Sequence, residues 1–186
     1  MLFRSGVFVS GTDVYAAGYE YSGVTAVAKI WKNGVVTSLT NGTNDAVANI
    51  VFVSGTDVYV AGYENNGTKD VAKIWKNGVA TSLTNGTNDA QASNVFVSGT
   101  DVYVAGFENN GTKDVAKIWK NGVAIALTNG TNDAYANEVF VFGTDVYVAV
   151  DESNGTKSVA KIFKNGVATA LTNGTNDAVA YSTFVK

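Results

Sequence analysis

The amino-acid sequence predicts an all-β protein made of four equal, four-stranded units, and three observations support this prediction. From Val7 onward the sequence repeats with a constant period of 44 residues. Each repeat contains short runs rich in β-branched and aromatic residues, separated by Gly- and Asn-rich turn signals, which is the pattern of strands in a sheet. No window of the sequence carries a sustained helical period of apolar residues.

The repeat boundaries divide the chain into a short N-terminal segment, four units and the start of a fifth. Residues 1–6 match no repeat, and the units cover residues 7–50, 51–94, 95–138 and 139–182. Residues 183–186 open a fifth unit, with Phe184 in register with Phe140. Because the second and third units differ at only six positions, we expect near-identical pieces of structure.

Within the second unit, the strand signals cover residues 49–54, 57–64, 70–76 and 79–84. Asn77-Gly78 separates the last two and predicts a type I′ hairpin, because both central residues of this turn need a positive φ. The second strand, "VYVAGY", is apolar or small on both of its faces. A sheet with one face in water would alternate apolar and polar residues, so this strand is predicted to be covered on both sides.

Four strands in a period of about 44 residues are typical of one blade of a β-propeller. The order "VFVSGTDVYVAGYENNGTKDVAKIW" resembles a WD-repeat blade, with "KIW" at residues 29–31, 73–75 and 117–119 where that family has Lys-Leu-Trp. The Gly-His pair of the family is missing, and a lysine follows each Trp in place of Asp. The sequence is similar also to secreted bacterial proteins with near-identical propeller repeats. This resemblance implies a β-propeller-like array of four blades, either closed or an open arc of a larger propeller, and favours an extracellular or cell-surface location.

The N-terminal segment has two interpretations. Leu2 to Ser5 can be encoded by CTC-TTC-CGA-TCT, the end of a common sequencing-library adaptor. On this interpretation residues 1–6 are a sequencing or cloning artefact, and the chain is a metagenomic fragment of a longer array. The alternative is an irregular capping segment, because the terminal repeats of such arrays are often atypical. The only arginine of the chain, Arg4, and the abrupt start of the repeat favour the first.

Composition excludes several classes of function. The chain has no Cys and no His, which excludes thiolate nucleophiles, imidazole bases and His or Cys metal sites. A net charge of −3 and a pI near 4.8 argue against a nucleic-acid partner. No apolar stretch approaches the roughly 18 residues that a membrane-spanning helix needs. We expect no metal and no cofactor.

A Trp recurs at one strand position in three units and is replaced by Phe163 in the fourth. These rings could stack on sugars or fill the space between blades. Packing is the better interpretation, because Phe163 keeps the bulk and loses the indole N–H. The positions are Trp31, Trp75, Trp119 and Phe163.

Two polar motifs recur with them. An Asp follows each Gly-Thr pair and is expected to cap the turn through side-chain to backbone hydrogen bonds, at Asp13, Asp57, Asp101 and Asp145. Their near-identical environments argue against the two unlike carboxylates of a glycosidase. The motif "TNGTNDA" either binds Ca²⁺ or forms a turn with local Asn side-chain bonding; its low carboxylate count favours the turn.

Chain geometry singles out one face as the candidate binding site. In a four-stranded blade, the loop between the second and third strands and the loop after the fourth emerge on the same side. These are the longest and most polar loops, and function on rigid scaffolds usually lies in such loops. One position in them varies between units, although drift without constraint explains this equally well. The candidate residues are Val47, Gln91, Tyr135 and Val179 at that position, with the acidic residues Asp45, Asp89, Asp133 and Asp177.

The sequence therefore favours a non-enzymatic binding or scaffold propeller that uses its polar Asn/Thr/Asp-rich loop face. A lectin-like carbohydrate-binding module is the alternative, supported by the abundance of Tyr, Trp and Asn. A propeller domain from a larger extracellular enzyme is a third option. The expected partners are a protein or carbohydrate ligand, together with self-association through exposed terminal blades.

Overall fold

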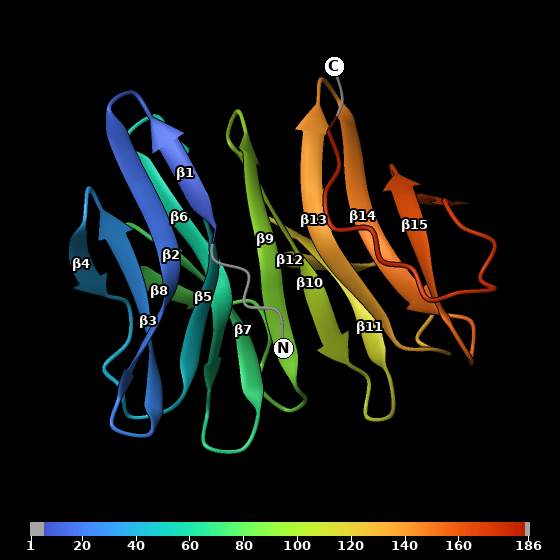
Figure 1. Ribbon diagram of the computed structural model, residues 1–186, viewed down its shortest axis with the longest axis horizontal. Helices are drawn as coiled ribbons and strands as arrows, with labels where there is room; N and C mark the ends of the chain where they lie inside the picture. Colours follow the sequence, from blue (N-terminus) through green and yellow to red (C-terminus); the bar gives the residue numbers. More distant parts are fainter. Residues whose placement is uncertain (1–5, 185–186) are drawn as a thin grey trace. The chain divides into compact units, whose positions relative to one another are not determined.

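A computed structural model describes residues 6–184 of the 186-residue chain. Within these residues the chain forms sixteen strands and no helix, and the strands make four antiparallel four-stranded sheets (Figure 1). This confirms the predicted all-β fold of four repeated, blade-like units. Residues 1–5 lie outside the described residues, so the two interpretations of Leu2 to Ser5 stay predictions. The last two residues of the fifth unit also lie outside the described residues.

Each sheet consists of four strands in sequence order, and each corresponds to one repeat. The first sheet contains β1 (Val7–Ser10), β2 (Asp13–Ser22), β3 (Thr25–Lys32) and β4 (Val35–Ser38). The second contains β5 (Ala46–Ser54), β6 (Asp57–Asn65), β7 (Asp70–Lys76) and β8 (Val79–Ser82). The third contains β9 (Ala90–Ser98), β10 (Asp101–Asn109), β11 (Asp114–Lys120) and β12 (Val123–Ala126). The fourth contains β13 (Ala134–Phe142), β14 (Asp145–Ser153), β15 (Ser158–Lys164) and β16 (Val167–Ala170).

The first strand of the second repeat begins earlier than the sequence pattern indicates, at Ala46 instead of residue 49. Ala46 and Ala48 are completely buried, so small side chains continue the strand into what looked like a polar loop. The register shifts between Ala48 and Ile50, and Asn49 between them donates a hydrogen bond from Nδ2 to the carbonyl of Ala92 at 2.8 Å. This bulge accommodates one extra residue on the strand.

The Asn-Gly turns adopt the predicted geometry. Asn77 has φ 51° and Gly78 has φ 82°, so both central residues of the β7–β8 hairpin lie in the left-handed region. That pair of positive angles is what a type I′ turn requires. The other three repeats have the same turn at Asn33, Asn121 and Asn165.

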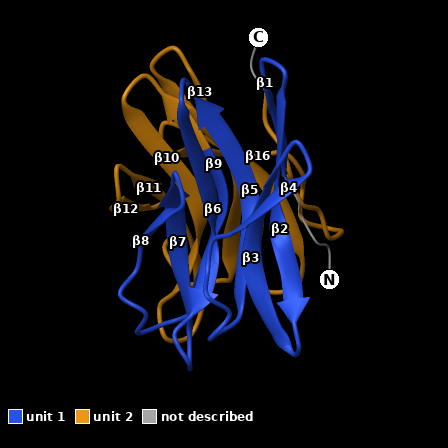
Figure 2. Cartoon of the chain, turned by 90° about the vertical axis from the view of Figure 1, so that its left-hand side faces the viewer, with its two compact units in different colours: residues 1–95 blue, residues 96–186 orange. Residues whose placement is uncertain are grey.

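The chain divides into two compact units, residues 1–95 and 96–186 (Figure 2). In the first unit, a buried cluster joins the first and second sheets, with Tyr15 and Ala17 on one side and Val51, Val60 and Trp75 on the other. The cluster thus covers one face of β2 and one face of β6. On the other face of β6, Tyr59 and Ala61 are buried as well, as predicted for this strand, which is apolar or small on both faces.

The second unit has an equivalent core between its two sheets. Tyr103 and Ala105 of the third sheet contact Val139, Val148 and Phe163 of the fourth. Each of these residues lies 88 positions after its counterpart in the first unit. The first and second repeats therefore pack in the same way as the third and fourth repeats.

Three of the four residues at the recurring Trp position fit the packing interpretation, and Trp31 of the first repeat is only partly buried. Trp75 and Trp119 are both 0% exposed, and Phe163 is 4% exposed. Neither buried indole Nε1 has a hydrogen-bond partner among residues 6–184. A sugar could not reach these rings, and Phe163 fills the same position without burying a polar N–H.

Residues 178–184 keep contacts of the repeat without entering a sheet. Asn137 Nδ2 donates to the carbonyl of Ala180 at 3.0 Å, the counterpart of the Asn49 bond. The Phe184 ring lies 5.6 Å from that of Phe140, close to the 5.1 Å between Phe96 and Phe140. The described start of the fifth unit therefore follows the repeat pattern but forms no strand.

Candidate binding site on the long-loop face

The two longest loops of a repeat lie against each other, as the chain geometry predicted. Asn66, in the β6–β7 loop, donates from Nδ2 to the carbonyl of Gly86, in the β8–β9 loop, at 2.9 Å. Lys69 Nζ and Asp89 Oδ2 lie 2.7 Å apart between the same loops. The two loops of this repeat therefore form one surface, and the equivalent surfaces together are called the long-loop face.

The four candidate aspartates tie these loops together. In each repeat, Oδ1 of the aspartate accepts a hydrogen bond from a backbone N–H at the start of the third strand. This bond is called the aspartate tie. The bonds join Asp45 to Ala26 (2.8 Å), Asp89 to Asp70 (3.1 Å), Asp133 to Asp114 (3.1 Å) and Asp177 to Ser158 (3.0 Å). These carboxylates therefore have a structural role in the loops.

A lysine in the neighbouring loop reinforces three of these ties. Lys113 Nζ lies 2.8 Å from Asp133, and Lys157 Nζ lies 2.8 Å from Asp177. The hydrogen bonds from the lysines, together with those from the backbone N–H groups, lower the pKa of Asp89, Asp133 and Asp177 below the usual carboxyl value. The loop carboxylates are thus held in their charged form.

The variable position joins the same network in two repeats. Gln91 Nε2 donates to Asp70 Oδ2 at 2.8 Å, and the Tyr135 hydroxyl donates to Asp114 Oδ2 at 2.8 Å. The Tyr135 ring also contacts Phe107 edge to face, with centroids 5.1 Å apart. Gln91 therefore connects through Asp70 to the aspartate tie of its repeat, and Tyr135 connects through Asp114.

The other two variable residues are apolar and make different contacts. Val47 is partly buried and lies opposite Tyr63 in the β5–β6 register. Val179 is 40% exposed and belongs to no strand. Of the eight candidate residues, the structure thus brings Gln91 and Tyr135 into the networks of Asp89 and Asp133.

Burial and nearby carboxylates act on the phenols of this face. Burial, with the negative charges of Asp70 and Asp45, raises the pKa of Tyr63 to about 12. Burial and the hydrogen bond to Asp114 also raise the pKa of Tyr135. Both phenols therefore act as neutral groups at physiological pH.

The "TNGTNDA" motif forms the predicted turn with local side-chain bonding. The Asn side chain accepts a hydrogen bond from the backbone N–H two residues later, as in Asn41 to Thr43 at 2.9 Å. The other repeats do the same, with Thr87, Thr131 and Thr175 as donors. No group of three or more acidic side chains within residues 6–184 is arranged to hold a metal ion.

At the other end of the strands, where the tight turns lie, each repeat has a second polar cluster. Its contacts differ from the expectation. Asp57 was expected to cap its own turn, but its Oδ1 accepts a hydrogen bond from Asn77 Nδ2 at 2.8 Å. Its Oδ2 lies 2.7 Å from Lys76 Nζ, which also lies 5.3 Å from the centre of the Tyr59 ring. The cause is the type I′ hairpin, which brings Lys76 and Asn77 against the start of β6. Asp13, Asp101 and Asp145 have the same partners in their repeats.

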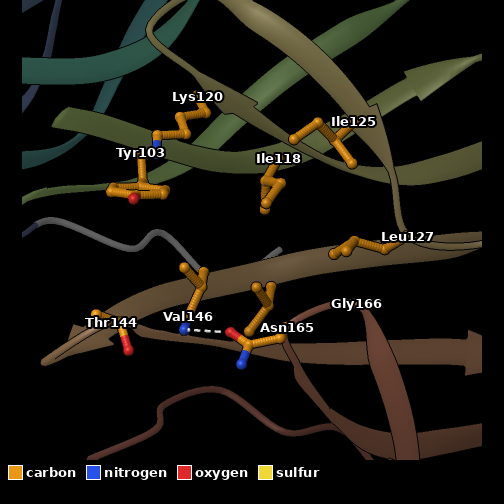
Figure 3. Close-up of a pocket in the computed structure, with 10 residues that line it drawn as sticks. Tyr103, Ile118, Lys120, Ile125, Leu127, Thr144, Val146, Asn165 and Gly166 are labelled. Atoms are coloured by element: carbon orange, nitrogen blue, oxygen red, sulfur yellow. Dashed lines mark hydrogen bonds between the residues drawn. The ribbon is translucent and has the colours of Figure 1, made fainter.

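Between the two sheets of each unit lies a pocket on this tight-turn side. The pocket in the second unit has a volume of about 290 Å³, and that in the first about 210 Å³. Figure 3 shows the larger one, in which Ile118 and Ile125 lie across from Val146. Sequence reasoning missed both pockets, because it assigned only tight turns to this side.

No protein-family model matches the chain, and no curated protein matches its sequence. Within residues 6–184 there is also no helix of the length and apolarity needed to cross a membrane.

Proposed function

We propose that the chain is a non-enzymatic binding or scaffold protein of β-propeller-like design that presents its long-loop face to a ligand. The observation that carries this proposal is the aspartate tie, which recurs in four repeats and fixes the loop after the fourth strand to the start of the third strand. Loops ordered before binding lose less conformational entropy when a partner arrives. The face therefore favours association without any need for catalytic groups.

The exposed groups of this face favour a protein partner. Each "TNGTNDA" turn exposes an amide and a hydroxyl side chain at equivalent positions, for example Asn85 and Thr87. Amides and hydroxyls can bond to peptide groups or to sugar hydroxyls. A carbohydrate ligand usually also needs an exposed aromatic platform. Trp75 and Trp119 are buried, and the exposed Tyr21 does not recur, because its counterparts are Asn65, Asn109 and Ser153. We therefore place a carbohydrate second to a protein.

An array experiment tests this proposal. The labelled chain is applied to an oligosaccharide array and to an array of folded proteins, followed by a Thr87→Ala, Thr131→Ala variant. Binding should be found on the protein array and should weaken in the variant. Thr81→Ala is the matched control, because Thr81 is also exposed but lies on β8, away from the loops. Binding that survives loss of both loop hydroxyls, or that is confined to the sugars, would contradict the proposal.

We also propose self-association through the first-sheet face, defined as Val7, Val9 and Val14. Val7 is 63% and Val9 61% exposed, whereas their counterparts Val51 and Val53 are 1% and 8% exposed. In the first unit, a sheet of nearly the same sequence covers Val51 and Val53. A second copy of the chain therefore offers a suitable partner for the exposed valines.

Sedimentation velocity over a range of concentrations tests this second proposal. The wild-type chain should form larger species as its concentration rises, and a Val7→Lys, Val9→Lys variant should remain monomeric. Val35→Lys with Val79→Lys is the control, because these valines are 71% and 70% exposed and lie outside the inter-sheet cores. A wild-type chain that is monomeric throughout, or a control that abolishes association, would rule the face out.

A further inference from the structure

The pocket of the second unit is apolar on its walls. Ile118 and Leu127 belong to the third repeat, and Val146 and Val148 come from β14 of the fourth sheet. Ile125 of β12 completes the wall and is 46% exposed. A large aliphatic side chain that is half exposed beside a concave surface gains from being covered.

The Asn165 and Lys120 side chains at this pocket already have partners. Asn165 Oδ1 accepts a hydrogen bond from the Val146 N–H at 2.8 Å (Figure 3). The Asn165 Nδ2 donates to Asp145 at 2.8 Å. Lys120 Nζ lies 2.7 Å from Asp101. A ligand therefore gains little by offering polar groups here, and an apolar group fits the pocket best. A volume of about 290 Å³ is at the small end for ligand pockets. It is ample for one ring or branched side chain, since a cavity of about 150 Å³ holds benzene.

The edge of the third sheet runs beside the pocket. The sheet ends at β12, and all four residues of this strand are exposed. The sequence of β12 is Val-Ala-Ile-Ala, with no charged residue and no proline to protect the edge. The third repeat has Ile125 and Ala126 where the second has Thr81 and Ser82, so β12 is the more apolar of these two edges.

We propose that an extended peptide adds to the free edge of β12 and places one apolar side chain in the pocket of the second unit. Addition of a strand to a sheet edge supplies main-chain hydrogen bonds, while a pocket for an alternate side chain supplies specificity. Ile125 joins the two parts, because it belongs to the edge strand and also lines the pocket.

The first unit provides an internal comparison. Its pocket is lined by the counterparts of the same residues except Thr144, and Thr37 of β4 stands where the second unit has Ile125. The first-unit pocket is also smaller, at about 210 Å³. The same peptide should therefore bind more weakly there, since less apolar surface is covered.

The test uses an acetylated and amidated pentapeptide, Thr-Val-Phe-Val-Thr, titrated into the isotope-labelled full chain and followed by NMR. The peptide should shift the methyl signals of Ile118, Ile125 and Leu127 together with the backbone amides of β12. Ile125→Thr should weaken this binding by about fivefold, since it removes aliphatic surface from the wall. Val123→Thr is the matched control and should change the affinity less than twofold, because Val123 lies on the same strand and does not line the pocket.

Two further probes separate the parts of the proposal. Thr-Val-Ser-Val-Thr, which lacks the apolar anchor, should lose most of the binding. N-acetyl-phenylalanine amide, which cannot form a strand, should bind much more weakly than the pentapeptide. Equal binding of the serine peptide, equal binding of the single amino acid, an unaffected Ile125→Thr variant, or no binding of the phenylalanine peptide would each overturn the proposal.

Discussion

Replacing Trp75 with phenylalanine should destabilise the protein much less than replacing it with alanine. Trp75 is 0% exposed in the core of the first unit, and its indole Nε1 has no hydrogen-bond partner within residues 6–184. The fourth repeat has Phe163 at this position, 4% exposed and packed in the equivalent core. The chain therefore already contains the product of the milder substitution.

The two changes differ in what they leave behind. Trp75→Ala removes the whole ring from a closed core, which typically lowers the free energy of unfolding by about 3–5 kcal/mol. Trp75→Phe keeps a six-membered ring and removes a buried N–H without a partner, whose burial costs about 1–3 kcal/mol. This gain offsets most of the lost packing, so we expect a net change within about 1 kcal/mol. For a chain of this size, the alanine variant should melt about 6–20 °C lower than the wild type.

Urea unfolding followed by circular dichroism measures both variants against the wild type. Trp119→Phe serves as a second case, because Trp119 is also 0% exposed and its Nε1 also lacks a partner among the described residues. Equal losses of stability in Trp75→Phe and Trp75→Ala would refute the reasoning, since the indole N–H would then be making a favourable contact.

Three further outcomes follow from the loop network. The folded-state pKa values of Asp89, Asp133 and Asp177 lie below the ordinary 3.8. The stabilising contribution of these carboxylates is therefore complete above that pH and disappears as the pH falls through the lowered values. The melting temperature should be steady down to about pH 5 and fall below about pH 4. In an alkaline titration at 295 nm, the difference between the wild type and Tyr63→Phe should show a midpoint near 12, and a midpoint near 10 would contradict the burial of that phenol. Tyr135→Phe removes the hydrogen bond to Asp114 and keeps the ring contact with Phe107, so urea unfolding should show a loss of about 0.5–1.5 kcal/mol, and no loss would place the hydroxyl in water.

Local sequence rules predicted the strands and turns because the repeat contains strong local signals. Asn77-Gly78 specified its turn, and the two apolar faces of "VYVAGY" specified burial on both sides. The start of β5 was predicted three residues late, since Ala46 and Ala48 carry no strong strand propensity and are held by burial against other residues.

Contacts that depend on how turns meet were harder to predict. The pairing of Asp57 with Lys76 and Asn77 joins residues about 20 positions apart, and no local pattern identifies it. The pockets depend on the spacing between successive sheets, which the sequence of a single repeat does not specify. Ile125 was the only visible signal, as an apolar replacement on an outer strand.

Amide hydrogen exchange at the aspartate ties tests most directly whether the long loops are held in place before any ligand binds. The N–H groups of Ala26, Asp70, Asp114 and Ser158 each donate to a loop aspartate. All four should exchange slowly in the free protein, and Asp89→Ala should release Asp70 while leaving Asp114 protected. Exchange of these four amides at the rates of an unstructured chain would contradict the account, because the loops would then not be ordered in advance.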